Sequence, residues 1–116
     1  MLKKKKAKNG KCNVSLDGEL DIYAAASFHE AFMPCLNDCK SIVIDLSEVS
    51  EMDTSCFQVL IQAKRECEET GKEMQMVSHS PAVLEILDLY DMENFFGDPL
   101  LLPSNDGDNA TTENKA

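Results

Sequence analysis

The chain has 116 residues, of which 43% are hydrophobic and 28% are charged, and its formal net charge is −10. This length suits a single domain with one hydrophobic core, and the composition is ordinary for a globular protein. The apolar runs are too short to cross a membrane, and no apolar segment follows the basic N-terminus as it would in a signal peptide. We therefore expect a cytoplasmic protein without membrane insertion.

The basic residues are concentrated at the N-terminus. Six of the 11 Lys and Arg residues lie within positions 1–11, whereas all 21 Asp and Glu residues follow that segment. A body this acidic repels nucleic acid and anionic lipid headgroups, and although the lysine run could bind either, we expect no nucleic-acid partner. Residues 1–10 form a separate lysine-rich segment, which is either solvated or a protected edge strand, because charged lysines discourage edge-to-edge pairing.

We expect the five cysteines to be reduced thiols, because their number is odd and their spacings match no disulfide framework. Cys35 and Cys39 lie four residues apart with His29 upstream, a spacing that a helix could bring together around a metal. A zinc site needs a second ligand pair, and none occurs at the right spacing. The interpretation is half-buried free cysteines, no metal and no other cofactor.

The first predicted element is a β-hairpin. The Asn-Gly pair at positions 9–10 is a strong tight-turn signal, and it would join strands over residues 2–8 and 11–16. The Asp-Gly pair at positions 17–18 allows a bulge or a bend in the chain that follows.

Residues 23–37 form the first predicted helix, since apolar residues recur there at three- and four-residue steps. Pro34 lies inside this pattern and should kink or end the helix near Met33. Residues 41–46 are a compact apolar segment that predicts a central strand with both faces covered.

The second half of the chain repeats the alternation. An amphipathic pattern predicts a helix over residues 56–70, and a strand over 73–78 follows it. A Ser-Pro pair at positions 80–81 starts another helix. Residues 100–102 are a candidate final strand, and the polar residues 103–116 read as a disordered tail. Alternating strands and helices predict an α/β fold with a mixed sheet.

Asp53, Thr54 and Ser55 lie at a strand-to-helix junction. Backbone N–H groups at a helix start lack partners and the helix dipole is positive there, so the position tolerates a phosphate. Gln58 completes a capping box with Ser55, which would explain the serine without any function. Asp53 is the alternative cap, in which case Ser55 lies in the first turn and the carboxylate orients its hydroxyl. Ser55 is thus a structural cap or a phosphorylation site, with Thr54 as a secondary candidate.

We expect no catalytic residue in this chain. The two histidines, His29 and His79, belong to no motif that would bring them to Ser55, and there is no Gly-x-Ser-x-Gly elbow. A Gly-rich phosphate-binding loop is also missing from the sequence. The expectation is that the protein is not an enzyme.

Three segments together resemble the STAS domain family, which includes the anti-sigma factor antagonists, also called anti-anti-sigma factors. These segments are Gly18-Glu-Leu-Asp21 with Ala24-Ala-Ala26, Ile42-Val-Ile-Asp-Leu-Ser47 leading to Met52-Asp-Thr-Ser55, and Ser80-Pro81 opening a helix that ends near Asn94-Phe-Phe96. The resemblance spans residues 11–102. It implies a mixed β-sheet of four to five strands with helices packed mainly on one side.

The resemblance also implies a bacterial partner-switching protein in signal transduction and transcription regulation. It implies binding to a serine protein kinase that is also an anti-sigma factor, phosphorylation of Ser55, and reversal by a phosphoserine phosphatase. The implied partner-binding residues are Asp21, Asp53, Thr54, Ser55 and Cys56. Cys56 replaces the usual glycine and adds bulk where a kinase must approach. The alternative is a non-phosphorylated subunit of a lipid-transport or chemotaxis-associated complex, as in other family members.

Overall fold

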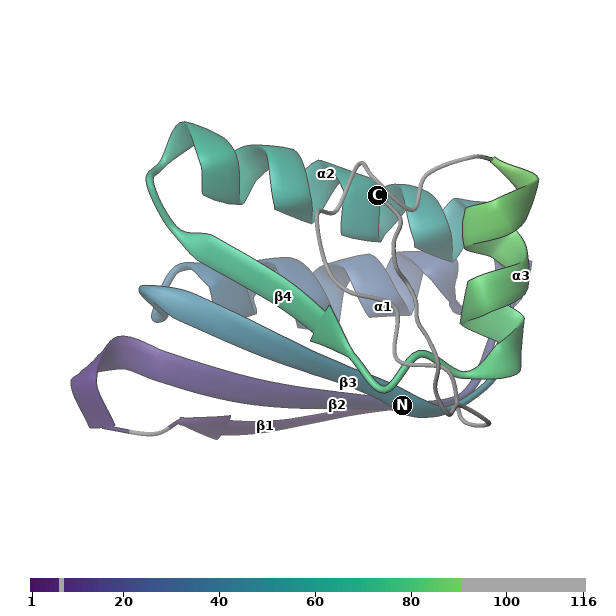
Figure 1. Ribbon diagram of the computed structural model, residues 1–116, viewed down its shortest axis with the longest axis horizontal. Helices are drawn as coiled ribbons and strands as arrows, with labels where there is room; N and C mark the ends of the chain where they lie inside the picture. The colour runs from purple at the N-terminus through teal and green to yellow at the C-terminus, as the bar shows by residue number, and fades with distance from the viewer. Residues whose placement is uncertain (7, 91–116) are drawn as a thin grey trace, which may run out of the picture.

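The computed structural model describes residues 1–6 and 8–90, and four strands within these ranges form one mixed sheet. The sheet order is β1-β2-β3-β4, in which β1 pairs antiparallel with β2 and the other two pairs are parallel. The strands are β1 (Leu2–Lys6), β2 (Lys11–Leu20), β3 (Ser41–Met52) and β4 (Glu73–Val77). The predicted α/β class with a mixed sheet is therefore confirmed (Figure 1).

The N-terminal hairpin forms as predicted. Asn9 and Gly10 have φ values of 68° and 78°, in the left-handed region that tight hairpin turns require. Farther along β2, the register against β3 shifts between Gly18 and Glu19, and Gly18 itself has a φ of 84°. The bulge predicted at positions 17–18 is confirmed, and β2 continues beyond it to Leu20.

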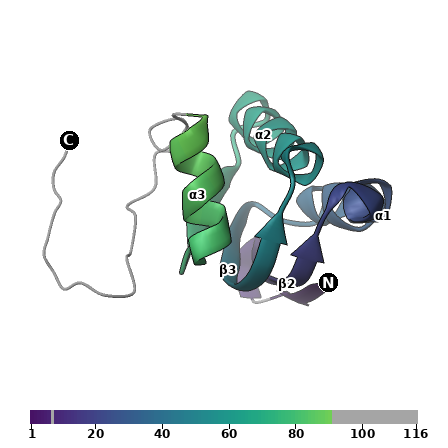
Figure 2. The same ribbon diagram turned by 90° about the vertical axis from the view of Figure 1, so that its right-hand side faces the viewer.

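Within the described residues, three α-helices pack on one side of the sheet (Figures 1 and 2). They are α1 (Ala25–Phe32), α2 (Thr54–Glu69) and α3 (Pro81–Leu89). A 3₁₀ turn, η2 (Ile22–Ala24), leads into α1, and another, η3 (Met33–Leu36), follows it. Because Pro34 lies at the start of η3, the α-helix ends at Phe32, as the position of the proline predicts.

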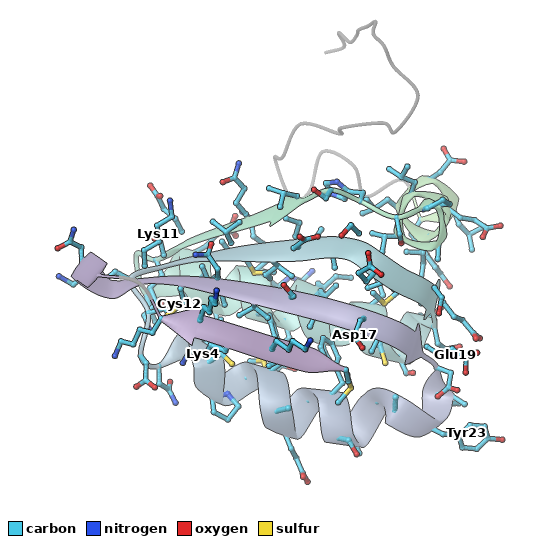
Figure 3. The ribbon with its side chains drawn as sticks, turned by 90° about the horizontal axis from the view of Figure 1, so that it is seen from below. Lys4, Lys11, Cys12, Asp17, Glu19 and Tyr23 are labelled. Carbon is cyan, nitrogen blue, oxygen red and sulfur yellow. A yellow bond between two sulfur atoms is a disulfide. The ribbon has the colours of Figure 1, made fainter. Side chains whose placement is uncertain are left out.

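Strand β3 is central, but the helices cover only one of its faces. Ile42, Ile44 and Leu46 are buried beneath the helices, whereas Val43 and Asp45 on the alternate face are partly exposed. The expectation that both faces are covered is therefore wrong over the described residues. Figure 3 looks onto this open face of the sheet.

One disulfide joins Cys12, near the start of β2, to Cys39, just before β3. The prediction that all five cysteines are reduced thiols is therefore wrong. In the parallel β2–β3 pair, Lys11 lies opposite Ser41, so the starts of the two strands are neighbours and the two Cα atoms lie 5.8 Å apart. The other three cysteines, Cys35, Cys56 and Cys67, are free and buried.

No helix within residues 1–6 and 8–90 is both long enough and apolar enough to span a membrane. The predicted strand at 100–102 and the predicted tail at 103–116 lie outside the described residues.

Candidate functional site

The candidate site lies at the edge of the sheet where the parallel strands β2 and β3 both end. Leu20 and Met52 are register partners there, and the backbone N–H of Asp53 donates to the carbonyl of Leu20 at 2.8 Å. Asp21 and Asp53 directly follow these strand ends. The fold thus brings together two segments that are more than thirty residues apart in the chain.

Asp53 is the N-cap of α2. Its Oδ2 accepts a hydrogen bond from the backbone N–H of Ser55 at 2.9 Å and another from the Ser55 hydroxyl at 2.7 Å. The prediction that Ser55 is the N-cap and forms a capping box with Gln58 is therefore wrong. The alternative prediction is confirmed: Ser55 lies in the first turn, and Asp53 orients its hydroxyl. The hydrogen bond from the Ser55 hydroxyl, assisted by the backbone N–H, lowers the pKa of Asp53, so the carboxylate is ionised at neutral pH.

Thr54 has a different partner. Its Oγ1 lies 2.9 Å from the hydroxyl of Tyr90, the residue that follows α3. The Tyr90 ring also stacks against Phe57, with ring centroids 6.3 Å apart, and this contact holds the phenol beside the start of α2. Sequence reasoning missed Tyr90, because no local pattern connects two residues that are 36 positions apart.

Cys56 lies inside the protein rather than on its surface. Its side chain has no exposed area, and Sγ lies 3.4 Å from the carbonyl oxygen of Asp21, to which the thiol donates. Burial, reinforced by the charge of Asp53, raises the pKa of this thiol, which stays protonated. The expectation that Cys56 adds bulk on the approach of a kinase is therefore wrong, and the residue instead links α2 to the end of β2.

Asp21 closes the other side of the site. Its Oδ1 accepts from the backbone N–H groups of Tyr23 and Ala24, at 3.0 Å and 3.1 Å, and so caps the turn η2. All five residues predicted for partner binding are therefore gathered at one end of the sheet. Asp53, Thr54 and Ser55 are partly exposed there, as is Asp21, while Cys56 supports them from beneath.

An open groove of about 400 Å³ runs from the start of α2 to α3. It is lined by Met52, Asp53, Thr54, Ala82, Glu85, Ile86, Asp88 and Leu89. Three of these residues carry carboxylates and none is basic, so the groove extends the negative charge of the site.

Charge is separated along the strands. Glu19 and Glu51 are register partners close to Asp21 and Asp53, and Asp17 pairs with Glu48 two register pairs earlier. Lysines gather at the opposite end of the sheet, where β2 begins. Figure 3 shows this separation, with Lys11 at one end of the sheet and Asp17 and Glu19 toward the other.

The hypothetical metal ligands are not brought together. Cys39 belongs to the disulfide, Cys35 is buried and His29 is exposed on α1. Within the part of the chain that the structure describes, no three His, Cys, Asp or Glu side chains form a group that could hold a metal ion.

Solved structures with a similar fold include several anti-sigma factor antagonists. A putative member from Thermotoga maritima shares 20% identity at a TM-score of 0.75, and the match covers 89% of this chain and 88% of that one. Unphosphorylated SpoIIAA shares 16% identity at a TM-score of 0.71, with 89% and 90% of the two chains covered. The phosphorylated form of SpoIIAA, from Bacillus, shares 15% identity at a TM-score of 0.68, with 89% and 93% covered.

The sequence profile of a family described as "Mlab, STAS domain" matches residues 4–103. This match includes the end of β1, every element from β2 to α3 and all five residues of the candidate site. The resemblance noted in three separate segments therefore extends over most of the chain, which belongs to the STAS domain family.

Proposed function

We propose that this protein is a partner-switching regulator of the anti-sigma factor antagonist type, controlled by reversible phosphorylation of Ser55. The observation that carries the proposal is the Ser55 hydroxyl in the first turn of α2, partly exposed and hydrogen-bonded at 2.7 Å to the ionised Asp53. SpoIIAA, which shares the fold, has been solved in an unphosphorylated and a phosphorylated form, and this supports a cycle of reversible phosphorylation. The protein would work in the cytoplasm, where kinase and ATP are present.

In this proposal the chain is a substrate and a binding partner rather than an enzyme. A serine kinase that is also an anti-sigma factor transfers the γ-phosphoryl group of its ATP to Ser55 Oγ, and ADP remains on the kinase as the other product. The hydroxyl proton passes to a base on the kinase or to water. Phosphoryl transfer depends mainly on positioning, and the hydrogen bond to Asp53 fixes the direction of the Ser55 hydroxyl.

Phosphorylation would change the surface and leave the fold intact. The phosphate adds about −1.5 to −2 charges next to Asp53, and the positive end of the α2 dipole partly compensates for them. A kinase that still holds a nucleoside diphosphate presents further negative charge at Ser55, so the modified protein is repelled. The unmodified form then binds the kinase and releases its other client, and a phosphoserine phosphatase restores that form.

The test is phosphorylation by the cognate kinase with ATP, measured by intact mass. We expect one added phosphate on the wild type and on Thr54→Val, and none on Ser55→Ala. Equal labelling of Ser55→Ala would contradict the site, and an unlabelled wild type would contradict the proposed function. We also expect Ser55→Asp to weaken kinase binding without changing the melting temperature.

A second candidate is a constitutive subunit of a larger complex, in which Ser55 is never phosphorylated. Two observations favour it: both hydroxyls at the start of α2 already have partners within the chain, and the matching family profile is described as "Mlab, STAS domain". Under this candidate Ser55→Ala leaves complex formation unchanged, and purification of the complex recovers a transporter ATPase instead of a serine kinase.

A further inference from the structure

Two adjacent apolar side chains stand out on the surface beside the candidate site. Ile22 is 63% exposed and Tyr23 is 91% exposed, although both lie in the ordered turn η2 between β2 and α1. Figure 3 shows Tyr23 projecting beyond the end of the sheet, away from the core. Single exposed apolar residues are common, but a tyrosine and an isoleucine that are adjacent and this exposed form a surface that water solvates poorly.

The turn that carries this pair is fixed in place. Asp21 accepts the backbone N–H groups of Tyr23 and Ala24, so the turn is closed by two hydrogen bonds. The backbone carbonyl of Asp21 also accepts a hydrogen bond from the Cys56 thiol, and this bond connects the turn to the first turn of α2. Ile22 and Tyr23 are therefore held in a constant position relative to Ser55, and presenting them to a partner costs little backbone entropy.

The surroundings of the pair are acidic. Glu19 and Glu51 face each other across β2 and β3, and Asp21 and Asp53 follow them. The sequence has no Lys or Arg between positions 12 and 39 or between 41 and 63. Asp17, earlier in β2, pairs with the N-terminal ammonium at 3.2 Å. Such an environment repels nucleic acid and anionic lipid, and it favours a protein surface that carries Lys or Arg.

We propose that Ile22 and Tyr23 are the anchor by which this protein binds the kinase, inserting into an apolar pocket of the kinase that is rimmed by basic side chains. This inference rests on the proposed function. Tyrosine suits the role, because it buries a large area with few rotatable bonds and is enriched among the residues that dominate binding energy. The anchor provides affinity, and Ser55 beside it provides the regulated contact.

The test uses the full chain and the purified kinase with ADP, and measures affinity by calorimetry. We expect Tyr23→Ala to weaken binding about 10-fold or more, and Ile22→Ala several-fold. Tyr23→Phe keeps the ring and should stay within about threefold of the wild type. Gln75→Ala, on the open face of the sheet in β4, is the matched surface control and should bind like the wild type.

Phosphorylation of Ser55 provides the second measurement. Tyr23→Ala should raise the KM of the kinase for this protein while leaving kcat close to the wild-type value, because the anchor contacts the kinase away from the reacting oxygen. Thermal unfolding should be unchanged, since the Tyr23 side chain packs on almost nothing.

The outcomes separate the two proposals. A wild type that binds and is phosphorylated on Ser55, together with a Tyr23→Ala variant of equal affinity and KM, overturns the anchor and leaves the proposed function standing. A wild type that neither binds the kinase nor accepts phosphate overturns both. A loss of binding in Tyr23→Ala that Gln75→Ala and Tyr23→Phe do not share supports the anchor.

Discussion

The hydroxyl oxygens of Thr54 and Tyr90 lie 2.9 Å apart, whereas the neighbouring Ser55 hydroxyl donates to Asp53. Two adjacent hydroxyls at the start of α2 are therefore held by different elements. The Thr54 hydroxyl is hydrogen-bonded to the phenol hydroxyl of Tyr90, whose ring stacks on Phe57. The Ser55 hydroxyl is hydrogen-bonded to the Asp53 carboxylate that caps α2.

Tyr90→Phe should reduce the selectivity for Ser55. The substitution removes the hydroxyl that engages Thr54 and keeps the ring that stacks on Phe57. We expect phosphopeptide mapping after incubation with kinase and ATP to find phosphate on Thr54 in addition to Ser55. Tyr90→Phe combined with Thr54→Val is the control and should return labelling to Ser55 alone. Labelling confined to Ser55 in the single variant would show that Tyr90 does not protect Thr54.

Asp53→Ala should destabilise the protein, while Asp53→Asn should largely preserve it. Alanine removes the cap of α2, with an expected loss of roughly 5 °C in melting temperature, whereas asparagine still accepts from the Ser55 backbone N–H. Because the folded pKa of Asp53 is lower than the usual 3.8, its charge contributes stability above that pH, and this is lost as the pH falls through the folded pKa. Melting curves of the wild type and Asp53→Asn should therefore converge in acid.

Removing the disulfide should lower the free energy of unfolding by roughly 3 kcal/mol, because the bond closes a long loop in the unfolded chain. Its two cysteines are 27 positions apart. Urea unfolding of the wild type with a thiol reductant should match that of a Cys12→Ala/Cys39→Ala double variant, which the reductant should leave unchanged. Thiol titration of the unreduced, denatured protein should find the three free cysteines; five reactive thiols would contradict the bond.

His79 should make the protein less stable in mild acid. Its side chain is 3% exposed, its Nδ1 has no hydrogen-bond partner among the described residues, and burial lowers its pKa below the usual 6.5. The unfolded chain therefore binds a proton more readily than the folded one, so stability is full above pH 6.5 and falls as the pH drops below that value. Denaturant midpoints should decrease toward about pH 5 in the wild type and less so in His79→Leu. If the denaturant midpoints of the wild type and His79→Leu fell equally with pH, His79 would not be the group that destabilises the protein in acid.

Most of the fold could be predicted because its signals are local. The Asn-Gly turn, the apolar segment at 41–46 and the Ser-Pro helix start each act over a few residues, and each appears where expected. The length of β3 could not be predicted in this way. In residues 47–52 polar and apolar residues do not alternate regularly. These residues form a strand because the part of β2 that follows the bulge pairs with them.

The site was only partly predictable for the same reason. Asp53 and Ser55 are neighbours in sequence, so the two capping arrangements could both be foreseen, and the observed geometry selects Asp53. The contact between Thr54 and Tyr90 and the bond between Cys12 and Cys39 depend on how distant segments pack. Their sequence spacing carries no sign of either pairing.

Over the described residues, the separation of charge along the sheet produces a dipole along the strands, with its negative end toward Asp21 and Asp53. In the field of a positively charged protein, such a molecule rotates before contact and arrives with that end foremost. Its association rate should then fall steeply as salt is added, because mobile ions screen the field beyond roughly 10 Å at 0.1 M ionic strength. The lysines at the far end would thus speed recognition at a surface that they never touch.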